Sequence, residues 1–181
     1  MSFLPSVIAS HFEMSDPVLF KFIAKIETFE VVEGDDYFAS LCSSIVSQQL
    51  STRVANVIFE RLLHLFPDQK LDPKKTLELS EAELRAVGLS FAKIKYIKDL
   101  SSKVLSGELQ LENLPAMSND EVIAELTQVK GIGKWTAEMF LMFTLGRVDV
   151  FSHGDLGLKK AIQKIYGLIE LPTEAEMVRL E

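Results

Sequence analysis

The segment between Glu125 and Lys160 holds two features that could do chemistry. Gly131 and Gly133 stand just before an apolar stretch typical of a helix, and Asp155 stands where another helix is expected to begin. Glycine turns let a backbone approach closely, and the N–H groups at a helix N-terminus attract anions. We therefore expect an anion-binding hairpin, followed by a carboxylate that either caps the next helix or acts on a substrate.

The side chains next to the two glycines also suit an anion. Lys134 and the hydroxyl group of Thr136 follow the turn, and both are expected beside the bound group. Ile132, between the glycines, is expected to anchor the turn in the core. The alternative is an ordinary helix–turn–helix whose glycines only end a helix.

Helical patterns recur along the chain and strand patterns are weak, so we expect an all-α fold. Asp16-Pro17 is a plausible N-cap and N1 pair, and three capping boxes begin at Ser80, Ser118 and Thr173. The expected helices span residues 17–27, 37–50, 54–66, 80–88, 90–107, 136–145 and 155–166, with two more that begin at Ser118 and Thr173.

The length of 181 residues indicates one domain or two small lobes that share a core. No apolar run reaches about 18 residues, so we expect no transmembrane helix and no membrane partner. The N-terminal residues lack the pattern of a signal peptide, which favours an intracellular, cytoplasmic protein. The only cysteine, Cys42, excludes an intramolecular disulfide and a four-cysteine iron–sulfur cluster.

The net charge of −7 argues against a protein that coats DNA. The charge is uneven, because residues 85–103 carry five basic and one acidic side chains, and residues 130–164 carry six basic and three acidic ones. Such segments suit contact with a short stretch of DNA, although ordinary solvated helix faces also explain them.

A longer pattern is more specific than the two glycines. Residues 129–137 read V-K-G-I-G-K-W-T-A, an apolar helix is expected next, and residues 148–155 read V-D-V-F-x-x-x-D. This combination resembles the helix-hairpin-helix (HhH-GPD) glycosylases, which excise damaged bases from DNA, and is most similar to the 3-methyladenine DNA glycosylase II type. The resemblance extends from about Asp35 to Gly167.

The resemblance implies a two-lobed all-α fold without a sheet domain, with residues 1–181 forming a single glycosylase domain. One lobe is expected to span about 36–115, and the second to combine 1–35 with about 116–181. The second lobe would carry both the hairpin and Asp155. Family members usually continue with one or two more helices, so the resemblance implies a truncated C-terminus.

The implied activity is hydrolysis of the N-glycosidic bond of alkylated purines, such as 3-methyladenine and 7-methylguanine, in double-stranded DNA with the damaged base flipped out. Asp155 is the implied catalytic residue, and the hairpin amides would bind a DNA phosphate. No cofactor is required, but the carbonyl groups of Thr127, Val129 and Ile132 would hold Na⁺ or K⁺. We expect a monomer that associates with the nucleoid when it acts.

Trp135 favours a monofunctional enzyme. Bifunctional relatives, which also cut the strand, carry a lysine at this position that attacks C1′, and tryptophan cannot do so. Trp135 is expected to stack on a cationic flipped base, with core packing as the alternative. Tyr37, Phe38 and Phe151 are further candidates for the base pocket, and core packing is again the alternative.

Two other segments match the family. Residues 45–51 read I-V-S-Q-Q-L-S, in which Gln49 would fill the gap left by the flipped base, while Gln48 either contacts the orphaned strand or holds the loop. Residues 88–93 match G-L-S-x-x-K, and Lys93 is expected to meet a phosphate. Two other functions stay open: a glycosylase for another lesion class, and a non-catalytic or decayed DNA-binding protein.

Overall fold

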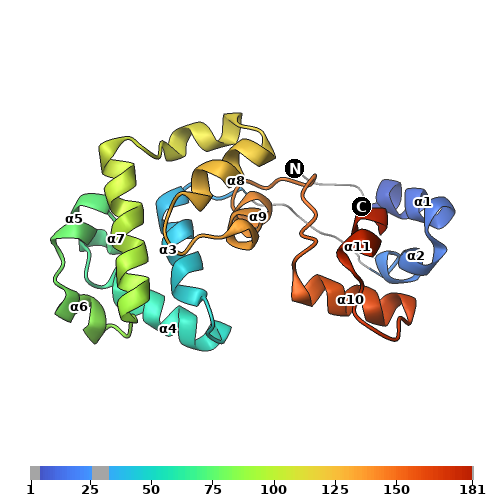
Figure 1. Cartoon of the computed structure of the whole chain (residues 1–181), viewed down its shortest axis with the longest axis horizontal. Helices are drawn as coiled ribbons and strands as arrows, with labels where there is room; N and C mark the ends of the chain where they lie inside the picture. Colours follow the sequence, from blue (N-terminus) through green and yellow to red (C-terminus); the bar gives the residue numbers. More distant parts are fainter. Residues whose placement is uncertain (1–4, 26–32, 181) are drawn as a thin grey trace. The chain divides into compact units, whose positions relative to one another are not determined.

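The structure is a computed structural model that describes residues 5–25 and 33–180. Every regular element in these residues is a helix, which confirms the expected all-α fold (Figure 1). The chain forms two compact units, one of residues 34–145 and one that joins 1–33 with 146–181. None of the described helices is long and apolar enough to cross a membrane.

Helix α3 (Tyr37–Ser47) is the centre of the 34–145 unit, because α4, α7 and α9 all contact it (Figure 1). Its apolar face, with Leu41, Ile45 and Val46, is fully buried. The other elements of this unit are α4 (Thr52–Leu63), η1 (Pro67–Gln69), α5 (Pro73–Glu78), α6 (Glu81–Ala86), α7 (Phe91–Ser106), η2 (Leu111–Ala116), α8 (Asn119–Thr127) and α9 (Lys134–Phe143).

The discontinuous unit contains α1 (Pro5–Ser15), α2 (Pro17–Ile23), α10 (Leu156–Tyr166) and α11 (Glu174–Leu180). Asp16 joins the two chain segments of this unit, because its carboxylate caps α2 and also accepts a hydrogen bond from the Tyr166 hydroxyl group. The hydrogen bond from the Leu19 amide, followed by that from Tyr166, lowers the pKa of Asp16. Burial raises the pKa of Tyr166 to about 12.

The expected helix starts are confirmed more closely than the helix ends. All three capping boxes form, with Ser80, Ser118 and Thr173 each exchanging hydrogen bonds with a glutamate three residues later. The helix expected over 37–50 instead ends at Ser47, because Gln48 leaves the helical conformation with ψ of 128°, and Gln49 then adopts a left-handed one with φ of 58°. The helix expected over 17–27 ends at Ile23, and its expected last two residues lie outside the described ones.

The boundary between the units differs from the expected lobes. The hairpin was expected in the same lobe as Asp155, but it belongs to the 34–145 unit, while Asp155 belongs to the other. The reason is that α9 packs on α3, with the rings of Tyr37 and Phe140 5.9 Å apart. The Gly34 N–H group also donates to the Thr144 carbonyl, at 2.8 Å, so the two ends of this unit meet.

Gly131 lets the hairpin lie directly against α7. Its φ is 83°, and a Cβ atom built on it would lie 2.1 Å from Cδ2 of Tyr96, which is far inside contact distance. Gly133 differs, because its φ is −97° and a Cβ atom there would meet nothing within 4 Å. The two glycines therefore have different roles, of which only the first is set by packing.

We expect Gly131→Ala to lower the free energy of unfolding by about 2–4 kcal/mol, because alanine strains a left-handed backbone and collides with Tyr96. The matched Gly133→Ala variant should lose at most about 1 kcal/mol, since only an N-cap preference changes. Urea unfolding of both variants beside the wild type measures the difference. Equal losses in the two variants would contradict this account of the packing.

Candidate nucleic-acid interface and active site

The hairpin between α8 and α9 presents backbone N–H groups at the surface. Val129 and Ile132 are buried and anchor the turn, which is closed by a hydrogen bond of 3.0 Å from the Ile132 N–H group to the Val129 carbonyl. Gly131 and Gly133 are exposed. Gly133 is the N-cap of α9 and makes no side-chain cap, so the first N–H groups of α9 can receive an anion.

The two side chains expected around this anion differ in their exposure to solvent. Lys134 is exposed, and its ammonium group lies 3.8 Å from the carboxylate of Glu138, which is buried. Thr136, whose hydroxyl group was expected beside the anion, is buried with only 6% of its surface exposed. The first turn of a helix points successive side chains in different directions, and that of Thr136 turns toward the core.

Trp135 is the aromatic residue that the hairpin exposes, with 49% of its surface accessible in the first turn of α9. Among the other pocket candidates, Tyr37 is half-buried against Phe140, and Phe38 is only 6% exposed. Phe38 is therefore a core residue and offers no open ring face to a base. Phe151 lies in the discontinuous unit, where its ring meets that of His153 with centroids 5.4 Å apart.

The turn after α3 carries Gln48 and Gln49 in different environments. The Gln48 side-chain amide donates a hydrogen bond of 2.7 Å to the carbonyl of Gly131, so this residue holds the turn to the hairpin. Gln49 is exposed, and its left-handed backbone distinguishes it from its neighbours. Of the two glutamines, Gln49 is the one that the turn presents to solvent.

The ammonium group of Lys93, which was expected to meet a phosphate, is hydrogen-bonded within the protein. It donates to the carbonyls of Val46 and Gln48, both at 2.8 Å, and so completes the C-terminal end of α3. Helix C-termini leave carbonyls without partners and favour a positive charge. Burial lowers the pKa of Lys93, as expected for a partly desolvated ammonium group.

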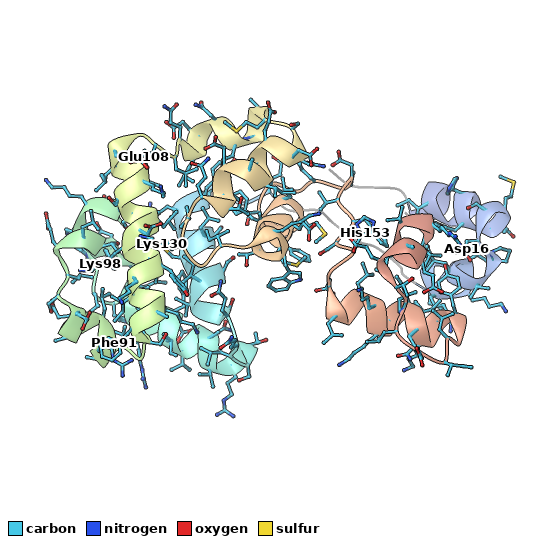
Figure 2. The ribbon with its side chains drawn as sticks, viewed as in Figure 1. Asp16, Phe91, Lys98, Glu108, Lys130 and His153 are labelled. Carbon is cyan, nitrogen blue, oxygen red and sulfur yellow. The ribbon has the colours of Figure 1, made fainter. Side chains whose placement is uncertain are left out.

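Two residues of α7 that the sequence reading missed also hold the hairpin. The Tyr96 ring lies against Gly131. The Asp99 carboxylate accepts hydrogen bonds from Lys130, the residue labelled in Figure 2, at 2.9 Å from its backbone N–H group and at 3.1 Å from its ammonium group. Burial alone would raise the pKa of Asp99, but the hydrogen bonds from Lys130 outweigh it and lower the pKa. Tyr96 follows Lys93 by three positions and Asp99 follows Tyr96 by three, so each neighbours the next along α7, a spacing that could have identified both residues.

Asp155 is the N-cap of α10 and is half-buried. Its carboxylate accepts a hydrogen bond of 2.5 Å from the Leu158 N–H group. Gly157 keeps space beside this group, because a Cβ atom at that position would lie 3.0 Å from the Asp155 Oδ1 atom. The capping role of Asp155 is thus present in the structure.

The chain is similar to several proteins of one kind. It is 31% identical over 163 residues to the DNA-3-methyladenine glycosylase 1 of Schizosaccharomyces pombe, an alignment that covers 89% of this chain and 72% of that protein. The chain spans between 53% and 72% of the length of the first three curated relatives that it matches.

Solved structures agree with these relatives. The crystal structure of a DNA-3-methyladenine glycosidase from Bacillus halodurans matches with a TM-score of 0.81 and 39% identity, covering 91% of this chain and 76% of that one. The 3-methyladenine DNA glycosylase of Schizosaccharomyces pombe in complex with abasic DNA matches with a TM-score of 0.83 and 28% identity, covering 94% and 85%.

The family model described as the HhH-GPD superfamily of base excision DNA repair proteins matches residues 42–180. This range includes the turn after α3, the hairpin and Asp155. The chain therefore belongs to the HhH-GPD superfamily of base excision DNA repair proteins.

Proposed function

We propose that this protein is a monofunctional DNA glycosylase that releases alkylated purines, such as 3-methyladenine and 7-methylguanine, from double-stranded DNA. The observation that carries the proposal is the exposed indole of Trp135 in the first turn of the hairpin helix. An indole face attracts cationic rings, and alkylated purines of this kind carry a positive charge. Relatives named DNA-3-methyladenine glycosylase or glycosidase support the same substrate class.

In this proposal Asp155 stabilises the positive charge that develops on the sugar. The C1′–N bond breaks, the base leaves with the bonding electrons, and water adds its oxygen to C1′ and releases a proton. A carboxylate beside C1′ lowers the energy of the oxocarbenium-like state, and the N-terminus of α10 favours a negative charge at this site. A cationic base is already a good leaving group, so the reaction requires little help from a general acid.

DNA binding would rest on the hairpin. Gly131 and Gly133 are exposed, and the N–H groups of these residues and of the start of α9 suit a backbone phosphate of duplex DNA bound by one copy of the chain. We also propose that the carbonyls of Thr127, Val129 and Ile132 hold Na⁺ or K⁺. Thr127 ends α8, where carbonyls lack helical partners, and the Val129 carbonyl has a second lone pair beside its bond to Ile132.

We expect Asp155→Asn to slow the release of free base from methylated duplex DNA by about 100-fold or more, because the charge on the carboxylate is lost. Asparagine is an equally good N-cap, so the fold should be unaffected. The matched control is Asp72→Asn, which makes the same change at the N-cap of α5 and should keep the wild-type rate. A wild type that binds DNA but releases no base would instead favour the non-catalytic alternative.

We expect no covalent complex when the protein is incubated with damaged DNA and sodium borohydride. A Schiff base needs an amine at the reacting sugar, and the hairpin helix offers an indole at Trp135 while Lys134 lies near Glu138. A trapped band would revive the bifunctional alternative. Its loss in Lys134→Gln would then identify the amine.

Trp135→Ala should slow release of cationic bases by about 5- to 100-fold, since stacking and cation–π contacts of this kind contribute roughly 1–3 kcal/mol. Trp135→Phe, which keeps an aromatic face, should lose less. Release of 7-methylguanine under single-turnover conditions measures both effects. An alanine variant with the wild-type rate would mean that Trp135 does not contact the base.

A further inference from the structure

The turn after α3 is held by a single side chain of α7. The Lys93 ammonium group bonds to the carbonyls of Val46 and Gln48, so it fixes both the last turn of α3 and the peptide group that leads into Gln49. Gln49 lies in the left-handed region, which residues other than glycine rarely adopt. This conformation therefore depends on restraint from its neighbours, and Lys93 supplies it on one side.

The same turn is tied to the hairpin through Gln48. Its Nε2 atom donates to the Gly131 carbonyl at 2.7 Å, across 83 positions of sequence. Only the NH₂ end of a glutamine amide can donate to a carbonyl, so the orientation of this side chain is fixed. A shift of the hairpin backbone at Gly131 would thus also displace the peptide groups on either side of Gln48.

Helix α7 contacts both the turn after α3 and the hairpin. Tyr96 and Asp99 follow Lys93 by three and six positions, so each of the three residues neighbours the next along the helix. Tyr96 lies against Gly131, and Asp99 holds the backbone of Lys130. One helix therefore fixes the turn at one point and the hairpin at two others.

We propose that Lys93 and Gln48 are positioning residues that set the distance between the turn 47–51 and the hairpin 127–136, so that the grip on a DNA phosphate places Gln49 for insertion into the duplex. The proposal rests on the glycosylase function proposed above. Neither residue needs to touch the damaged base, since both act through the backbone that carries Gln49. A misplacement of about 1 Å can slow a reaction by as much as roughly 100-fold.

The test compares two duplexes that carry the same alkylated base, paired in one and opposite an abasic-site analogue in the other. An unpaired base costs less to extrude, so its release depends less on an inserted side chain. We expect Gln48→Ala to slow single-turnover release about 10-fold or more from the paired duplex and less than about 3-fold from the unpaired one. Gln110→Ala is the matched control, because Gln110 also donates to a glycine carbonyl, that of Gly107, elsewhere in the unit.

A second pair of variants tests Lys93. Lys93→Met keeps the length of the side chain but removes its donors, and it should show the same dependence on pairing, whereas Lys93→Arg should restore part of the rate. The double variant Gln48→Ala, Lys93→Met should be little slower than the slower single variant, because both changes release the same turn. Losses that multiply in the double variant would mean that the residues act independently, and would overturn the proposal.

The remaining outcomes separate this inference from the function on which it rests. If wild type releases base and Gln48→Ala slows both duplexes by the same factor, the contact is only structural; the inference then fails while the glycosylase function stands. If the wild type releases base from neither duplex, the proposed glycosylase function is contradicted, and so is the inference that rests on it. Thermal melting of each variant excludes loss of the fold as the cause of a lower rate.

Discussion

An ammonium group placed over the end of a helix holds the turn that carries Gln49. Helix α3 stops at Ser47, where its last carbonyls have lost their helical donors, and Lys93 supplies the missing donor to two of them. The cost of partly burying the charge is visible in the lowered pKa of this lysine. Two charge-assisted hydrogen bonds and the negative end of the α3 dipole offset that cost.

The hairpin depends on the same helix through contacts of a different kind. Glycine is required at position 131 because the backbone is left-handed and the Tyr96 ring occupies the space of a side chain. At Gly133 the space is open, so packing does not require the absence of a side chain there. Of the two glycines of this short motif, only Gly131 is therefore fixed by the packing of the protein.

Local signals in the sequence predicted local structure well. The capping boxes at Ser80, Ser118 and Thr173 form as expected, because both partners of each box lie within four residues. The role of Lys93 could not be predicted in this way, since its partners are more than forty positions away and nothing near it in the sequence marks them. Helix α5 was missed because six residues are too few to show a period, although Asp72-Pro73 repeats the cap pattern seen at Asp16-Pro17.

The lysines near the hairpin lie close to acidic side chains, and this affects how the protein would search DNA. Lys130 lies against Asp99 and Lys134 lies near Glu138, so part of their charge is balanced inside the protein. A phosphate held mainly by neutral N–H groups displaces few of the counterions that surround DNA. Contact at the hairpin would then depend weakly on ionic strength, and undamaged DNA would retain the protein only briefly. Residence at a lesion would come instead from the inserted side chain and the stacked base.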